Sequence, residues 1–241
     1  MEFDDGSGPA LFAGGHFTMA GDVPTAHVAK WDGAAWSSPG DPIATHVFDL
    51  AVFDDGTGPA LFGAMRCTGP RLESCDLLKW DGRNWSAVGL RTNNFVQALA
   101  VFDNGTGPRL YLGGGFRQVN GMATFPLIEW DGVLWRSVGF IVGNSIQALT
   151  VYDDGFGPAL FAGGDFFAID YAFSHGVARW DGHKWSPLSP GGLSTGVWAL
   201  TGFDDGTGPA LFAGGTFGST FEGVISARMA KWSHPAPPCD P

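Results

Sequence analysis

Charged side chains, long apolar runs and helical periodicity are all scarce in this sequence of 241 residues. Charged residues make up 15% and hydrophobic residues 44% of the chain, a balance too apolar for a disordered segment. No stretch approaches the roughly 18 consecutive apolar residues that a membrane-spanning helix needs. Because no 3.6-residue apolar period is sustained, we expect almost no helix. The sequence therefore predicts a globular protein built from short, non-helical elements, with no membrane insertion.

Basic residues are also few, which excludes a class of partner. The chain has 13 Lys and Arg against 24 Asp and Glu, a net charge of −11. Binding to a phosphate backbone needs clustered positive charge, so we expect no nucleic-acid partner. The sequence contains no Gly-x-Ser-x-Gly elbow and no phosphate-cradling loop. We therefore expect no cofactor and no enzymatic activity.

Glycine and proline are abundant, and their positions reveal an internal repeat. The 38 Gly and 16 Pro together make 54 of the 241 residues. The segment 3–15 returns at 53–64, 102–114, 152–164 and 203–215. A second phrase follows each copy and is marked by tryptophans at Trp31/Trp36, Trp80/Trp85, Trp130/Trp135, Trp180/Trp185 and Trp232 alone. A period near 50 residues with frequent turns is typical of a propeller rather than a helical solenoid.

Each repeat divides into four predicted strands. In the third copy they are 96–102, 109–114, 127–130 and 134–137. An acidic glycine-rich turn separates the first two strands, and an Asp-Gly hairpin turn separates the last two. A four-stranded sheet needs cover on both faces, and stacking copies through the Trp and Phe columns supplies it. We predict an all-β fold, a five-bladed β-propeller with four-stranded antiparallel blades.

The predicted boundaries leave the two end repeats incomplete. A single domain spans 1–235, with repeats at about 1–46, 47–95, 96–145, 146–196 and 197–235, and a Pro-rich tail follows at 236–241. The first strand of the first copy is reduced to residues 2–3, and the fourth strand is missing after Trp232. The simplest interpretation is five blades closed in one ring, as a monomer. The alternative is a larger ring completed by a longer chain or a second copy.

The repeat resembles that of a known family. A Gly-Gly doublet ends the second strand, as at Gly14-Gly15, and Trp31-Asp32-Gly33 is followed five residues later by Trp36. This pattern resembles the kelch-type propeller repeat, and more closely the kelch-related repeats of bacterial secreted and surface proteins. The resemblance covers nearly the whole chain and implies architecture. It implies no particular activity, because this fold carries enzymes, lectin-like binders and scaffolds alike.

Two of the three cysteines lie in one loop that has no cysteine in the other repeats. Cys67 and Cys75 are separated by seven residues, and Cys239 lies in the Pro-rich tail. Two cysteines that close an exposed loop indicate a disulfide and therefore an oxidising compartment. Two free thiols are the alternative, and a zinc site would need two further ligands. We expect an extracellular or cell-surface protein.

Most acidic residues and histidines have structural interpretations. The doublets such as Asp4-Asp5 offer two carboxylates each, which is ordinary turn chemistry and too few ligands for calcium. The Trp-Asp-Gly aspartates are expected to cap their own hairpins. The histidines occupy different columns of the repeat (His16, His27, His46, His175, His183 and His234). Their spacing does not bring them together, so we predict no metal site.

The segments that differ between copies are the candidates for function. Loops between strands two and three, and between blades, emerge at the same end of every blade and mix aromatics with Asn, Arg and His. Such a mixture suits recognition of a glycan or a protein. The predicted ligand-binding residues are Trp198, Tyr171, Phe173, His175, Asn93, Asn94, Arg117 and Asn120. Trp198 stands outside the repeat columns, although it could also fill a gap left by Gly202.

The sequence thus predicts a non-catalytic secreted or surface propeller that binds a glycan or protein. One alternative is a glycoside hydrolase or lyase that pairs Asp49 with a loop carboxylate, Glu73 or Asp170. Another is a purely structural module of a larger extracellular protein, in which the loops vary only because surfaces drift.

Overall fold

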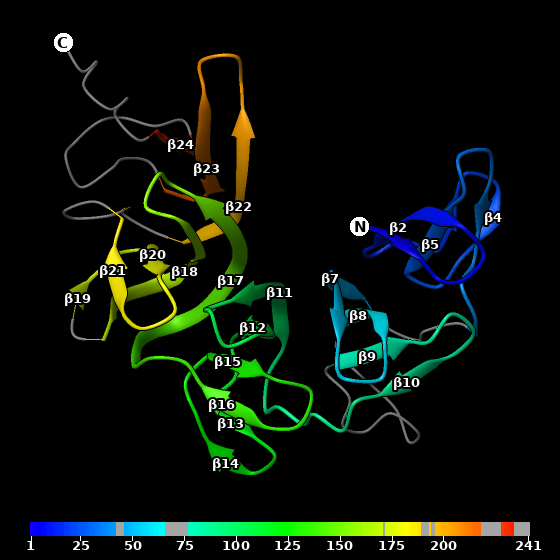
Figure 1. Ribbon diagram of the computed structural model, residues 1–241, viewed down its shortest axis with the longest axis horizontal. Helices are drawn as coiled ribbons and strands as arrows, with labels where there is room; N and C mark the ends of the chain where they lie inside the picture. The colour runs from blue at the N-terminus through cyan, green and yellow to red at the C-terminus, as the bar shows by residue number, and fades with distance from the viewer. Residues whose placement is uncertain are drawn as a thin grey trace. The chain divides into compact units, whose positions relative to one another are not determined.

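The computed structural model describes residues 1–41, 46–65, 77–170, 172–188, 193, 196–217 and 228–233. Across these residues every regular element is a β-strand, and five successive antiparallel sheets follow the chain (Figure 1). The described part of the chain has no helix with the length and hydropathy of a membrane span. The prediction of an all-β, five-bladed β-propeller is confirmed.

The first three blades each contain four strands in sequence order. The first comprises β1 (Glu2–Asp4), β2 (Pro9–Gly14), β5 (Val28–Trp31) and β6 (Trp36–Ser37), with the hairpin β3 (Met19–Ala20) and β4 (Val23–Pro24) beside it. The second comprises β7 (Val47–Asp54), β8 (Pro59–Met65), β9 (Leu77–Trp80) and β10 (Trp85–Ala87). The third comprises β11 (Val96–Asp103), β12 (Pro108–Gly114), β15 (Leu127–Trp130) and β16 (Trp135–Ser137), with the hairpin β13 (Gln118–Val119) and β14 (Met122–Ala123).

The last two blades differ from this pattern in opposite ways. The fourth gains a short strand and comprises β17 (Ile141–Asp153), β18 (Pro158–Ile169), β19 (Ala172–Phe173), β20 (Val177–Trp180) and β21 (Trp185–Pro187). The fifth has three strands among the described residues, β22 (Val197–Asp204), β23 (Pro209–Gly215) and β24 (Met229–Trp232).

The chain forms two compact units, each with its own apolar core. One contains residues 1–101 and 108–138, and the other contains residues 102–107 and 139–241. The first core includes Phe53, Phe62 and Trp130, all at most 5% exposed. The second includes Phe161 and Leu211, which are also buried. β8 is buried at every position from Ala60 to Met65, so the second blade is covered on both faces, as the repeat pattern predicts.

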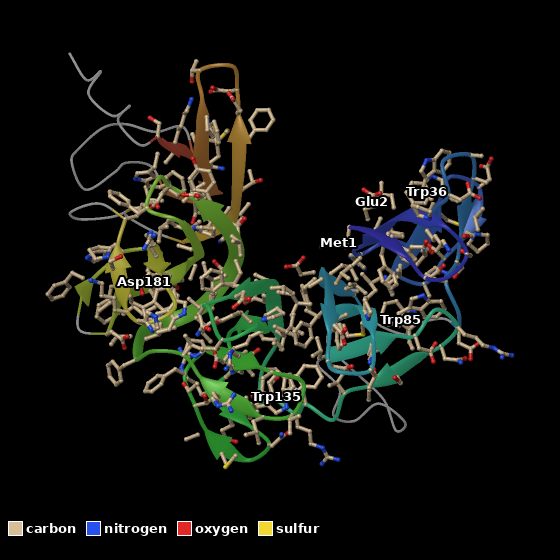
Figure 2. The ribbon with its side chains drawn as sticks, viewed as in Figure 1. Met1, Glu2, Trp36, Trp85, Trp135 and Asp181 are labelled. Carbon is tan, nitrogen blue, oxygen red and sulfur yellow. The ribbon has the colours of Figure 1, made fainter. Side chains whose placement is uncertain are left out.

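The aromatic columns are what hold neighbouring blades of the first unit together. The ring of Trp130 in the third blade lies 5.8 Å from the rings of both Phe53 and Phe62 in the second. Gly132 approaches the same blade so closely that a Cβ atom would lie 2.5 Å from the carbonyl oxygen of Asp55. The second tryptophan of each of the first four repeats lies on the fourth strand of its blade, and Figure 2 labels three of them, Trp36, Trp85 and Trp135. Large aromatic surfaces buried in this way dominate the packing energy of such folds.

The Gly-Gly doublet reflects close backbone approach. A Cβ on the first glycine would lie 2.6 Å from Val47 at Gly14 and 2.8 Å from Val197 at Gly163, side chains of the following blade. A Cβ on the second glycine would overlap a backbone carbonyl oxygen of the same blade, that of Phe95 just before β11 at Gly114 and that of Ser145 in β17 at Gly164. Glycine can be required either by a positive φ or by a lack of space for a Cβ atom. At these four positions the lack of space explains the glycine.

Candidate binding site in the fourth blade

The fourth blade departs from the repeat at the loop-bearing end of its first two strands. β17 and β18 are 13 and 12 residues long, whereas β11 and β12 of the third blade are 8 and 7. The pairing of β17 with β18 shifts register between Val142 and Gly143, between Gly143 and Ser145, and between Ile146 and Ala148. β-Bulges of this kind bend a strand and redirect its side chains, and they are common beside functional sites.

Asn144 is the residue that this irregular pairing displaces from the ladder. Gly143 pairs with Phe166 and Ser145 with Asp165, so Asn144 lies between two registered pairs. Its side-chain Nδ2 donates a 2.6 Å hydrogen bond to Oδ2 of Asp165. A Cβ at Gly143 would overlap the backbone of Phe166, so this approach of the two strands requires glycine. The bulge thereby places an amide and a carboxylate together at the end of the blade.

A pocket of about 460 Å³ opens at this bulge. Its lining combines polar and apolar groups: Val142, Gly143, Asn144, Asp165, Phe166, Phe167, His175 and Leu193. The carbonyl oxygen of His175 accepts a 2.9 Å hydrogen bond from the Leu193 amide. This bond holds the loop that carries His175 in place. Phe167 is 46% exposed. The pocket therefore offers hydrogen-bonding groups of both kinds next to an accessible aromatic ring.

Trp198 lies at the same end of the adjoining strand β22 and is 61% exposed. Its Nε1, Oε1 of Gln147 and Oγ1 of Thr216 all lie within 3.7 Å of the position that a Cβ on Gly196 would occupy. Oε1 of Gln147 is buried and has no hydrogen-bond partner among the described residues. Trp198 does not fill a gap at Gly202, the alternative that the sequence left open, because the ring of Tyr152 occupies that space.

The other predicted binding residues divide between the two compact units. Phe173, on β19, is 73% exposed. Four of them belong to the first unit and are not among the residues that line the pocket of the fourth blade: Asn93, Asn94, Arg117 and Asn120. Oδ1 of Asn93 accepts the amides of Arg117 and Gln118 at 2.7 and 3.0 Å, and Oδ1 of Asn120 accepts the Arg91 amide at 3.0 Å. Asn93 and Asn120 therefore connect the loop before β11 to the hairpin of β13 and β14.

Three predicted residues lie outside the part of the chain that the structure describes. They are Tyr171 and the two cysteines of the proposed disulfide, Cys67 and Cys75. The pairing of those cysteines stays a prediction.

The acidic turns are structural, as the sequence predicts. Oδ1 of Asp54 accepts the amides of Gly56 and Gly58 at 2.8 and 2.9 Å. The second aspartate of the turn, Asp55, binds Nζ of Lys79 at 2.7 Å, and Lys79 also donates to Thr57. Burial alone would raise the pKa of Asp55, but the hydrogen bonds from Lys79 and Thr57 outweigh it and the net shift is downward.

The same arrangement recurs in the first and fifth blades. Lys30 binds Asp5, and Lys231 binds Asp205, at 2.7 and 2.8 Å. The hydrogen bond from Lys231 lowers the pKa of Asp205 to about 2. The Trp-Asp-Gly aspartates cap their hairpins, since Oδ1 of Asp32 accepts the amides of Ala34 and Ala35 at 2.8 Å each.

The structure corrects the expectation that the histidines stay apart. The ring centroids of His16 and His46 are 3.6 Å apart, and those of His27 and His46 are 5.3 Å apart. Burial, followed by the nearby His46 and His16, lowers the pKa of His27. The described residues contain no group of three or more His, Cys, Asp or Glu side chains placed to hold a metal ion. The cluster forms because two loops at the same end of the first and second blades meet.

The carboxylates considered for hydrolysis have backbone partners. Oδ1 of Asp49 accepts the Leu50 amide, and Oδ2 accepts the Leu99 amide of the next blade, both at 2.8 Å. Burial nevertheless raises the pKa of Asp49. Oδ1 of Asp170 accepts the Phe140 amide at 2.6 Å, and Glu73 lies outside the described residues. Asp49 therefore links the inner strands of two blades.

One departure from the repeat in the sequence indicates the pocket, although the prediction from the sequence did not single it out. Asp165 directly follows the Gly163-Gly164 doublet, at a position where the other copies have His16, Met65, Gly115 and Thr216. Gly143, Asn144 and Ser145 resemble a loop in composition, so the extension of β17 through them could not be expected.

Comparison with known proteins adds no relative. No family model, no curated protein and no solved structure matches this chain.

Proposed function

We propose that this protein is a non-catalytic recognition module that binds a glycan through the loop-bearing end of its fourth and fifth blades. The observation that carries the proposal is the bulge pocket, in which Asn144 and Asp165 stand beside Phe167 and His175. Sugars present hydroxyl groups around an apolar ring face, so they suit a site that joins amide and carboxylate groups to an exposed aromatic ring. Trp198 provides a second accessible ring at the same end of the adjoining strand.

The proposal includes the finer points of the sequence interpretation. We place the repeat among kelch-related propellers, on the strength of the Gly-Gly doublet and the Trp-Asp-Gly phrase. We also propose an extracellular location, supported by Cys67 and Cys75 in a single loop. Intact mass after alkylation without reductant tests the latter, because a disulfide leaves Cys239 as the single alkylated thiol. Three alkylated thiols in protein purified from an oxidising compartment would contradict it.

A glycan array with the full chain, followed by calorimetric titration of the best ligand, tests the binding function. Asp165→Ala and Phe167→Ala should each weaken binding at least about tenfold, because each removes a group that faces the ligand. Phe156→Ala is the matched control for Phe167→Ala, since Phe156 is an exposed phenylalanine (76%) at the opposite, turn-bearing end of the same blade. If no glycan binds above background, or if the pocket variants bind as the parent does, the proposal fails. If a protein binds instead, and its binding depends on the same residues, the pocket is a protein-binding site and not a glycan-binding site.

A further inference from the structure

We propose that the outer edge of the fifth blade is a docking site for an extended strand of a partner chain, whose tryptophan side chain fills an apolar pocket beside Trp232. The site lies on a different surface from the bulge pocket, so it goes beyond the proposed glycan binding. The argument starts from what the other four blades share.

In each of the first four blades, two tryptophans face one another across the third and fourth strands. They are direct register partners, Trp31 with Trp36, Trp80 with Trp85, Trp130 with Trp135 and Trp180 with Trp185. Their ring centroids are 5.4, 5.4, 4.9 and 5.2 Å apart. The second tryptophan of each pair is thus a fixed part of a complete blade.

The surroundings of that second tryptophan are clearest in the second blade. Trp85 packs on a cluster that contains Phe12, Leu61 and Trp80. Its Nε1 donates a 3.2 Å hydrogen bond to the carbonyl oxygen of Pro39, the third residue after the equivalent tryptophan of the preceding blade. An equivalent cluster, with Phe62, Leu110 and Trp130, receives Trp135 in the third blade.

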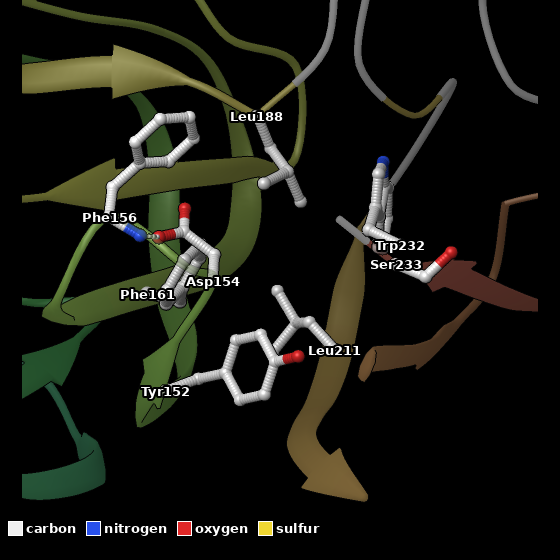
Figure 3. Close-up of a pocket in the computed structure, with 8 residues that line it drawn as sticks. All are labelled: Tyr152, Asp154, Phe156, Phe161, Leu188, Leu211, Trp232 and Ser233. Carbon is white, nitrogen blue, oxygen red and sulfur yellow. Dashed lines mark hydrogen bonds between the residues drawn. The ribbon is translucent and has the colours of Figure 1, made fainter. Parts of the chain in front are cut away.

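The fifth blade keeps this cluster but supplies one tryptophan. Phe161, Leu211 and Trp232 take the places of Phe12, Leu61 and Trp80. Leu188, the third residue after Trp185, takes the place of Pro39. Between them lies a pocket of about 250 Å³, lined by Tyr152, Asp154, Phe156, Phe161, Leu188, Leu211, Trp232 and Ser233. Figure 3 shows Tyr152, Leu188, Leu211 and Trp232 around this space.

The strand beside the pocket has one paired edge in the part of the chain that the structure describes. Within the described residues β24 is hydrogen-bonded to β23, and no fourth strand pairs with its other edge. The sequence after Trp232 lacks the hairpin signal of the other copies: Ser233 and His234 replace Asp and Gly, and no tryptophan follows. At that turn the equivalent glycines, such as Gly82 and Gly132, have φ of +95° and +94°. In the fifth copy the equivalent residue is His234, which precedes Pro235, and a residue before proline favours an extended conformation with negative φ.

These features define the occupant. An extended segment that pairs with β24 would satisfy its edge, as in other cases of strand addition to a sheet. A tryptophan opposite Trp232 would enter the pocket, with its indole N–H directed at the Leu188 carbonyl as Trp85 is directed at Pro39. The chain's own fourth strands give the pattern, Trp-Ser-Ala in β10 and Trp-Arg-Ser in β16.

The test is titration of the full chain with a fluorescent peptide of residues 132–138, Gly-Val-Leu-Trp-Arg-Ser-Val. We expect saturable binding that weakens at least about tenfold when the peptide tryptophan is replaced by alanine. The two peptides have the same charge, so attraction to the acidic protein cannot account for a difference. Leu211→Phe, which fills the pocket, should abolish binding. Leu11→Phe, the same change at the equivalent and exposed position of the first blade, should leave it unchanged.

Three results would overturn the proposal. One is equal binding of the two peptides, and another is no saturation at roughly millimolar peptide. The third uses a chain that ends at Ser233: if the peptide binds this shorter chain and not the full one, the tail after Ser233 is the occupant. Near-ultraviolet circular dichroism of each variant confirms that the blades remain packed, so that a loss of binding reports on the pocket.

Discussion

The indole nitrogen of Trp85 donates a hydrogen bond of 3.2 Å to the carbonyl oxygen of Pro39, across the boundary between the second and first blades. The two residues are 46 positions apart, nearly one repeat. A polar atom on an otherwise apolar side chain thereby fixes where the ring lies within the contact. The packing of neighbouring blades combines apolar area with this directional constraint, and the two contributions can be separated by substitution.

Trp85→Phe removes the indole N–H and keeps an aromatic ring. We expect a loss of about 0.5–1.5 kcal/mol in the free energy of unfolding from the lost hydrogen bond, added to the loss of ring surface. Trp135→Phe is the control, since Trp135 occupies the same column and is also half-buried. Guanidinium titration should show the larger decrease for Trp85→Phe. Equal decreases would mean that the bond to Pro39 adds nothing beyond packing.

The ion pair between a lysine and the second aspartate of the acidic turn recurs in several blades, so the same interaction can be compared at two degrees of burial. Lys79 and Asp55 have side chains 17% and 13% exposed, whereas those of Lys231 and Asp205 are 30% and 36% exposed. Lys79→Met should cost about 1 kcal/mol of stability, because less exposed ion pairs are screened less by water. Lys231→Met should cost less. Denaturation midpoints at low and high salt provide the measurement, and a larger effect at Lys231 would contradict this account.

Gly143 is the residue on which the shape of the bulge pocket depends. A methyl group there would overlap the backbone of Phe166, so Gly143→Ala must separate β17 from β18 locally. Overpacking of this kind costs about 1–3 kcal/mol, and we expect it to abolish glycan binding. Gly6→Ala is a useful contrast, because Gly6 has nothing within 4 Å of its missing Cβ. It should reduce stability through its positive φ and leave binding intact. Binding that survives Gly143→Ala would remove the bulge from the proposed site.

The features that the sequence predicts well are those that each repeat determines locally. An Asp-Gly or Asp-Asp-Gly turn needs only its own few residues, so Asp32 and Asp54 form the expected hydrogen bonds. The tryptophan columns recur at a fixed spacing, and their packing in one blade implies the same packing in the next. Five copies of one pattern therefore specify the blades without any knowledge of long-range contacts.

The features that could not be predicted arise where separate loops meet. The pocket depends on a register shift opposite Asn144, and the strength of one pairing register over another is decided by packing on both strands. The approach of His16 to His46 depends on how the loop after the second strand of one blade meets the loop that enters the next. Neither distance is encoded in the spacing of the residues along the chain.

The lowered pKa of His27 predicts that the stability of the protein depends on pH. The pKa of His27 is lower in the folded protein than its usual value of 6.5. As pH falls through 6.5 the unfolded chain gains a proton that the folded chain resists, so stability is complete above this pH and decreases below it. His27 has φ of +66°, a conformation that asparagine tolerates better than most residues. His27→Asn should therefore preserve the fold and flatten the decrease in melting temperature between pH 7.5 and pH 5.5. His183→Asn, at an exposed hairpin turn, should leave the pH dependence as it is, and an unchanged slope in His27→Asn would show that other groups cause it.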